Sequence, residues 1–145
     1  TLSSLIYFHL TYIDIRGILY IDSLGIECGG VNMKFNKGLI GGSMNLLLLS
    51  LLHEKDMYGY EIIRELELRS DKTFEFKEGT LYPVLHKLEN MGYINSYLSK
   101  GDTGRDRKYY QITKKGKKQL VEEKQQWEVF SQSVGKVVYS DDYDF

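Results

Sequence analysis

The sequence predicts a mainly α-helical protein with one small β-hairpin and a long C-terminal helix. Three observations carry this prediction. Residues 44–90 contain three segments with apolar residues at helical spacing, residues 93–113 contain two alternating segments around a turn, and residues 114–138 carry a further helical pattern. The 145 residues, 42% apolar and 27% charged, suffice for one packed domain with an appendage.

Two helices are predicted in the first of these regions. Residues 44–54, MNLLLLSLLHE, are apolar on nearly every side, as a fully buried helix is. Residues 56–70 form the second helix, with Asp56 as its N-cap. Its apolar stripe consists of Tyr60, Ile62, Ile63 and Leu66. Gly59 is about 1 kcal/mol worse than alanine in a helix interior, which indicates that another backbone approaches closely there.

A third helix is predicted within EGTLYPVLHKLENMGYI, residues 78–94, because three leucines recur at i, i+4 and i+7. Pro83 is placed in the first turn, where a missing N–H costs nothing, and Gly92 is a natural residue just after the helix. The leucines are Leu81, Leu85 and Leu88. The opposite face carries Thr80, Tyr82, Pro83, His86, Lys87 and Asn90. Such a face suits the DNA major groove, and an ordinary amphipathic surface helix is the alternative.

A β-hairpin is predicted after the third helix. Residues 93–99 and 107–113 alternate as strands do, and the KGDTGRD segment between them is rich in turn formers. Gly101 and Gly104 are able to take positive φ there. The resulting order of three helices, a hairpin and a helix is that of a winged helix-turn-helix, with residues 33–113 as the domain.

Positive charge is concentrated at the hairpin, although the formal net charge of the chain is only −1. Residues 100–118 contain eight cations against Asp102 and Asp106. Such asymmetry suits a protein with one side facing a polyanion, and a solvated lysine-rich face is the alternative. Cations on a wing that reaches over a DNA groove would position the protein on phosphates without reading bases.

The last helix is predicted at residues 114–138, with Thr113 as its N-cap. A heptad-like apolar seam runs along it at spacings of 7, 3, 4 and 3 residues. The seam consists of Leu120, Trp127, Phe130, Val134 and Val137. Because so small a domain has nothing left to cover this seam, we expect a C-terminal dimerisation helix. Residues 139–145 form an acidic tail.

Residues 1–32 read differently from the rest and are predicted to be an N-terminal extension. They are apolar, but Asp14, Arg16 and Asp22 leave no uncharged run of about 18 to 20 residues, so no membrane span is expected. The compact pattern starts at Met33. One interpretation is therefore that the extension is translated upstream sequence, not native or poorly ordered; the other is a genuine hairpin or helix packed on the domain.

Four stretches of the chain together resemble the PadR family of bacterial transcriptional regulators, in its small form with one C-terminal helix. They are MYGYEIIREL, EGTLYPVLHKLENMGYI, GRDRKYYQITKKGKKQL and WEVF, all within residues 36–138. The resemblance implies a dimeric DNA-binding protein, usually a repressor, that acts at an inverted-repeat operator and is released by a small effector. The sequence departs from the family at Asp106, where the usual wing has proline, and this places a negative charge beside the implied phosphate contacts.

The resemblance also assigns roles to individual residues. Trp127 stands where multidrug-responsive members place a tryptophan that stacks on planar aromatic ligands, although packing in the core or in a dimer is the alternative interpretation. The implied DNA contacts are Tyr58, Thr80, Tyr82, Pro83, His86 and Lys87 from the helices and Arg105, Arg107 and Lys108 from the wing.

The sequence predicts no enzyme site. His9, His53 and His86 lack metal-ligand spacing with one another and with Cys28, and there is no Gly-rich phosphate loop. We therefore expect no catalytic residue, metal or cofactor, and the lone cysteine fits a reducing cytoplasm. The main alternative function is a winged-helix module that binds protein partners and no DNA, which would not need the cations of the wing or of the third helix.

Overall fold

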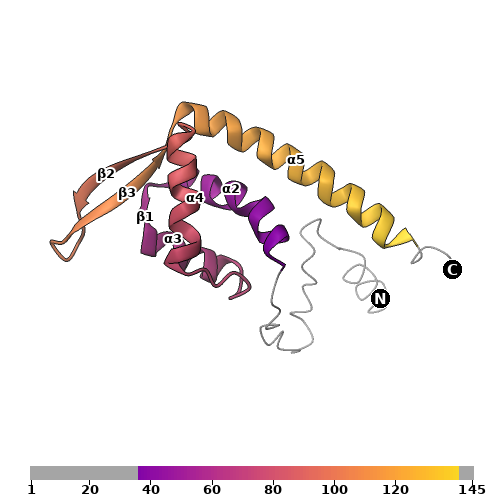
Figure 1. Ribbon diagram of the computed structural model, residues 1–145, viewed down its shortest axis with the longest axis horizontal. Helices are drawn as coiled ribbons and strands as arrows, with labels where there is room; N and C mark the ends of the chain where they lie inside the picture. Colours follow the sequence, from indigo (N-terminus) through magenta and orange to yellow (C-terminus); the bar gives the residue numbers. More distant parts are fainter. Residues whose placement is uncertain (1–35, 141–145) are drawn as a thin grey trace, which may run out of the picture. The chain divides into compact units, whose positions relative to one another are not determined.

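The computed structural model describes residues 36–140, so the predictions for residues 1–32 and for most of the acidic tail lie outside the described residues. The described part divides after Gln126 into two units. The elements, labelled as in Figure 1, are α2 (Lys37–Glu54), β1 (Met57–Tyr58), α3 (Gly59–Arg69), α4 (Glu78–Asn90), β2 (Ile94–Lys100), β3 (Asp106–Ile112) and α5 (Lys114–Val138). The structure is thus mainly α-helical with a small antiparallel sheet, and the predicted order of three helices, hairpin and helix is confirmed.

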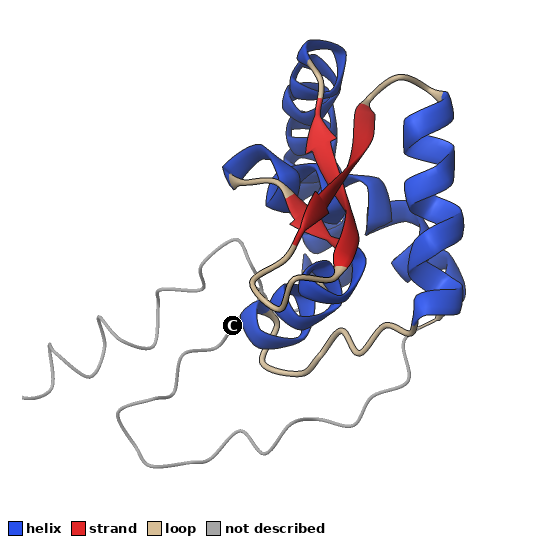
Figure 2. Ribbon diagram, turned by 90° about the vertical axis from the view of Figure 1, so that its left-hand side faces the viewer, coloured by secondary structure: helices blue, strands red, loops and turns tan. Residues whose placement is uncertain are grey.

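The sheet has three strands in the order β1-β3-β2, all antiparallel to their neighbours (Figure 2). The predicted hairpin of β2 and β3 runs in register from Ile94 opposite Ile112 to Lys100 opposite Asp106. The short strand β1, in which Met57 pairs with Tyr110, was not predicted. It joins the start of α3 directly to the wing hairpin.

The core of the winged-helix unit lies between α2, α3, α4 and one face of the sheet. The three leucines predicted for α4 are fully buried, as expected. Leu48, Leu49 and Leu52 of α2 and Ile62 of α3 are buried with them. The sheet and α5 complete the core with Met57, Ile94, Tyr110 and Leu120.

The helix α2 begins earlier than the sequence predicted, at Lys37 rather than at residue 44. Its start is set by Asn36, whose side chain accepts a hydrogen bond of 2.8 Å from the Gly38 N–H. This cap satisfies one of the free N–H groups of the first turn, so the helix runs on through Gly41 and Gly42.

The start of α3 corrects two predictions. Asp56 is not its N-cap, because Met57 and Tyr58 are extended to pair with β3, and Tyr58 occupies the cap position without a side-chain cap. The Asp56 carboxylate instead accepts a hydrogen bond of 2.7 Å from the Tyr97 hydroxyl. The group that approaches Gly59 is a side chain and not a backbone, since a Cβ there would lie 2.6 Å from the Tyr82 hydroxyl oxygen. In addition, the predicted stripe residue Tyr60 is exposed.

Pro83 lies further into α4 than predicted. The helix begins at Glu78 with Lys77 as the cap residue, so Pro83 is the sixth helical residue and stands in the second turn. It has no N–H to donate to the carbonyl of Gly79, and that residue is exposed to water. The C-terminal end agrees with the prediction, because Gly92 has φ of 77° and closes the helix with a hydrogen bond from its N–H to the Glu89 carbonyl.

The turn between α3 and α4 contains two consecutive non-glycine residues with positive φ. They are Asp71, with φ of 49°, and Lys72, with φ of 62°. The Ser70 hydroxyl stabilises this turn by accepting a hydrogen bond of 2.9 Å from the Phe74 N–H. The side chains of Asp71 and Lys72 are exposed, so their burial does not compensate for the backbone strain.

The first turn of α5 is packed closely against the end of α4. Thr113 is the N-cap, as predicted: its hydroxyl oxygen accepts from the Gly116 N–H at 3.0 Å and donates to the Gly92 carbonyl at 2.6 Å. Gly116 leaves no room for a side chain, because a Cβ there would lie 2.0 Å from the Tyr93 carbonyl oxygen. The first turns of α5 therefore belong to the packed unit.

Candidate nucleic-acid interface

The exposed face of α4 carries most of the residues that the sequence assigned to DNA. The three leucines are buried on one face of the helix, so the side chains on the opposite face point to solvent. This follows because a helix has 3.6 residues per turn. All five predicted α4 residues are exposed, which are Thr80, Tyr82, Pro83, His86 and Lys87. The structure therefore places a hydroxyl, an aromatic ring, an imidazole and an ammonium group on one accessible helix face.

Tyr58 is not part of this face but lies on the outer side of the sheet. There it forms a row with Tyr109 and Tyr97, one tyrosine from each strand at the same register. The rings of Tyr58 and Tyr109 meet edge to face at 5.5 Å, and those of Tyr109 and Tyr97 stack at 5.7 Å. The hydrogen bond to Asp56 raises the pKa of the Tyr97 phenol, which stays neutral and holds the row to the start of β1.

The three wing cations differ in their surroundings. Arg105 is exposed at the turn, and within residues 36–140 its side chain has no hydrogen-bond or ion-pair partner. Arg107 lies on the outer face, where its guanidinium carbon is 4.3 Å from the centre of the Tyr58 ring. Lys108 lies on the opposite face, with its ammonium 3.8 Å from the Glu89 carboxylate. Of the three, only Arg105 presents an unengaged charge.

The tip of the wing is shaped by its two glycines. Gly104 takes φ of 75°, as the sequence predicted, whereas Gly101 does not have positive φ, so that part of the prediction is wrong. A Cβ on Gly101 would lie 2.9 Å from the Arg107 side chain, so a larger residue there would require Arg107 to move. Asp106, the departure from the family pattern, stands opposite Lys100 in the register of the hairpin.

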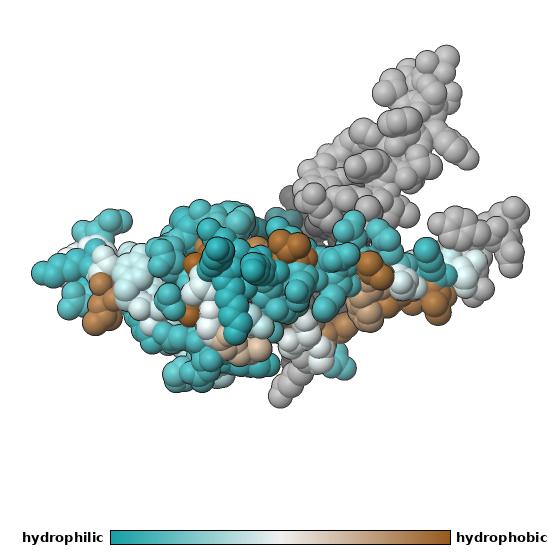
Figure 3. Space-filling view, turned by 90° about the horizontal axis from the view of Figure 1, so that it is seen from above, coloured by the Kyte–Doolittle hydropathy of each residue, from teal (hydrophilic) through white to brown (hydrophobic). Residues whose placement is uncertain are grey.

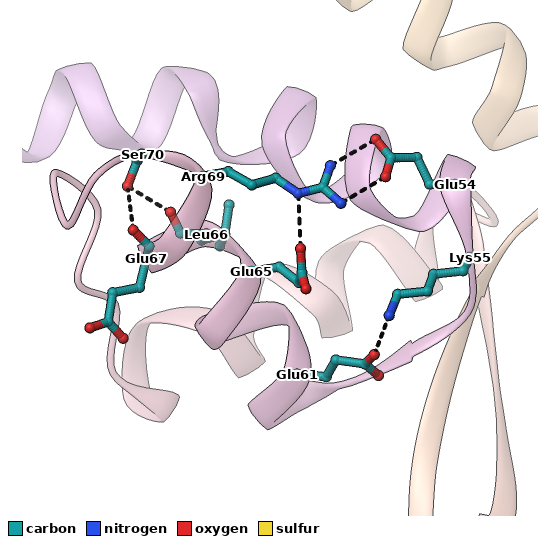
Figure 4. Close-up of polar contacts among 8 residues, drawn as sticks. All are labelled: Glu54, Lys55, Glu61, Glu65, Leu66, Glu67, Arg69 and Ser70. Carbon is teal, nitrogen blue, oxygen red and sulfur yellow. Dashed lines mark hydrogen bonds and ion pairs between the residues drawn. The ribbon is translucent and has the colours of Figure 1, made fainter. Parts of the chain in front are cut away.

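Ion pairs fasten α3 to α2 (Figure 4). The Arg69 guanidinium donates two hydrogen bonds of 2.7 Å to the Glu54 carboxylate and one of 2.9 Å to Glu65. The hydrogen bond from Arg69 lowers the pKa of Glu54, and the bonds from both carboxylates raise the pKa of Arg69. Lys55 pairs with Glu61 at 2.6 Å. These acidic side chains are therefore paired within the domain.

The predicted α5 seam is divided by the structure. Leu120 is 3% exposed and belongs to the core, so its assignment to a dimer surface is wrong. The other four members, Trp127, Phe130, Val134 and Val137, are between 42% and 76% exposed. Figure 3, in which hydrophobic residues are brown, shows apolar surface along this part of α5. The first turns of α5 bury Leu120 in the core, whereas the later turns leave their apolar side chains exposed.

Sequence reasoning did not find the contacts that join the wing to the rest of the domain. These are the tyrosine row on the outer face and the contacts of Glu89 with Ser96 and Lys108. The only available signal was that Glu89 is the first strong negative charge on the exposed side of α4 after its first turn. Within residues 36–140 there is no group of three potential metal ligands, and no helix there is long and apolar enough to cross a membrane.

Comparisons with known proteins point to one group. The model of the transcriptional regulator PadR-like family matches residues 48–122. An uncharacterized protein of Lysinibacillus sphaericus is 42% identical over 89 residues, which are 61% of this chain and 82% of that protein. A transcriptional regulator from Clostridium thermocellum is similar in structure, with TM-score 0.63, 37% identity and coverage of 68% of this chain and 96% of its own. A PadR-like transcriptional regulator from Bacillus cereus has TM-score 0.62 and 31% identity, with coverage of 70% and 96%.

Proposed function

The chain belongs to the PadR-like family of transcriptional regulators, and from this premise we propose that it is a sequence-specific DNA-binding repressor, acting as a homodimer and released from DNA by a small molecule. As a regulator of transcription it would work in the cytoplasm. Membership of the family supports the general role of a transcriptional regulator.

The exposed face of α4 is the observation that carries the proposal. Hydroxyl, imidazole and ammonium groups can donate hydrogen bonds to base edges in the major groove, and Tyr82 and Pro83 offer apolar contact. A helix of 13 residues is about 20 Å long, which suits insertion into a groove about 12 Å wide. We assign base reading to His86, Lys87 and Thr80.

The wing supports the proposal as a source of phosphate contacts. Arg105 at the tip is free to meet a phosphate, and the Arg107 guanidinium is held over the Tyr58 ring. Such contacts fix the register of a protein on the duplex and carry no sequence information. Tyr58 therefore contributes to DNA binding by placing Arg107, in addition to any contact of its own.

The open face of α5 supports a homodimer. Trp127, Phe130 and Val134 are too apolar and too close together to be left in water on a small monomer. A two-fold dimer would carry two copies of α4, as an inverted-repeat operator requires. Paired tryptophans across such an interface would also offer a flat site for a planar aromatic effector.

Competition binding tests the proposal. The probe is a labelled duplex from the DNA upstream of the gene, and the competitor is random duplex of equal length. His86→Ala should lower the preference for the probe, while Arg105→Ala should weaken binding to both duplexes and reduce the salt slope by about 0.9 for one lost phosphate contact. Equal affinity of the native protein for probe and random DNA would refute sequence-specific binding. If no duplex binds, the alternative of a protein-interaction module is favoured.

A further inference from the structure

Glu89, the second-last residue of α4, contacts both strands of the wing. Its carboxylate accepts a hydrogen bond from the Ser96 hydroxyl on β2. Its second oxygen lies 3.8 Å from the Lys108 ammonium on β3. Within residues 36–140, no other side-chain hydrogen bond or ion pair joins α4 to β2 or β3, so these two contacts are the polar links between helix and wing, beside the apolar packing of Leu88 against the core.

A carboxylate at this position needs an explanation. The negative end of the helix dipole opposes an anion in the last turn of a helix, and DNA phosphates would oppose it as well. The side chain is 28% exposed, so it is not hidden from the charges around it. Its contacts with Ser96 and Lys108 offset the unfavourable interaction with the helix dipole.

Lys108 is restrained by these surroundings. Its ammonium lies between the Glu89 carboxylate and the ring of Tyr110, whose centre is 5.5 Å away. The Lys108 side chain is 49% exposed, and a loose, half-exposed pair of this kind is worth no more than about a fivefold change in an equilibrium constant. A DNA phosphate could therefore bind Lys108 in place of Glu89. The gain in binding free energy would be smaller than with a lysine that has no partner.

We propose that Glu89 is a positioning and specificity-determining residue of the DNA interface. Through Ser96 it fixes the wing relative to α4, and through Lys108 it withholds one cation from DNA phosphates. The first effect favours the operator, because base contacts from α4 and phosphate contacts from the wing must form together. The second lowers affinity for every duplex. This inference rests on the proposed DNA-binding function.

Separate substitutions test the two effects. Glu89→Gln keeps an acceptor for Ser96 and removes the charge, so affinity for random DNA should rise up to about fivefold and the salt slope should grow by up to about 0.9 as Lys108 engages a phosphate. Ser96→Ala keeps the charge and removes the hydrogen bond. The ratio of operator to random affinity should then fall by up to about tenfold, with an unchanged slope.

Glu78→Gln is the matched control, because it removes the same charge from the same helix at a residue with no side-chain contact to the wing in the described structure. It should raise affinity for all duplexes alike. The salt slope should not increase, because Lys108 stays paired with Glu89. Circular dichroism melts show that each variant is folded.

The inference is overturned if Glu89→Gln matches Glu78→Gln in slope and affinity, or if Ser96→Ala keeps the native ratio. A native protein that binds the operator selectively in that experiment leaves the proposed function standing. A native protein without preference for any duplex removes the function itself.

Discussion

Gly116→Ala tests the packing of α5 against the end of α4. A Cβ at this position would lie 2.0 Å from the Tyr93 carbonyl oxygen and 2.8 Å from Ile112 Cγ1. Two heavy atoms cannot approach so closely without movement, and one of them is backbone. The first turn of α5 would therefore shift, and the hydrogen bonds of Thr113 to Gly116 and Gly92 would be strained or lost.

The net effect is a balance of three contributions. Alanine gains about 1 kcal/mol over glycine in a helix. Overpacking costs about 1–3 kcal/mol, and loss of an N-cap costs about 1 kcal/mol. The free energy of unfolding should therefore fall by about 1–3 kcal/mol, because the two unfavourable contributions exceed the gain in propensity.

Urea denaturation followed by circular dichroism measures this change. Gly42→Ala in α2 is the control, since among the described residues no atom outside its own helix backbone lies within 4 Å of its added Cβ, and it should stabilise the protein by up to about 1 kcal/mol. A Gly116→Ala protein that is as stable as the native one, while Gly42→Ala behaves as expected, would show that the contact between α5 and Tyr93 is not as close as described.

Four further predictions concern other parts of the fold. Lys72→Gly should raise the free energy of unfolding by about 0.5 kcal/mol, because strain at positive φ is relieved at the cost of some chain entropy; a lower melting temperature would argue against strain there. Arg69→Gln should destabilise the protein at neutral pH, and melts at decreasing pH should show this difference shrinking. The folded pKa of Glu54 is lowered, so its contribution is present above the pKa of the unfolded chain and is lost as pH falls through the folded value; a difference that is independent of pH refutes this. Phe130→Glu should sediment as a folded monomer, because the charge would be buried unpaired in a dimer; a Phe130→Glu dimer contradicts the assignment of the α5 face. Leu120→Ala should instead lower the free energy of unfolding by about 2–5 kcal/mol.

The elements with strong local signals were predictable from the sequence. The leucine repeat of α4, its closing Gly92 and the Thr113 cap depend on neighbours within a few residues, and all three predictions are confirmed. The alternation of the hairpin strands is equally local. The exposed α4 face then follows from the buried one, which is why its residues could be named before the structure was known.

The features that depend on tertiary contacts could not be predicted in this way. The strand β1 has only two residues and exists because Met57 and Tyr58 pair with β3. That pairing removes Asp56 from the start of a helix. Leu120 has the spacing of the open seam, yet it is buried because the first turns of α5 lie against the domain. The contacts of Glu89 join segments whose approach no periodicity reveals.

Selection of duplexes from a random DNA pool by the native protein shows whether the exposed face of α4 reads base sequence in a two-fold dimer. We expect enrichment of an inverted repeat whose half-sites are separated by about 10 base pairs or a multiple of the helical turn. Selection with His86→Ala should alter the preferred bases at equivalent positions in both half-sites and leave the spacing unchanged. A pool that stays random with the native protein, or an unchanged repeat with His86→Ala, would contradict the assignment of α4 as the helix that reads DNA.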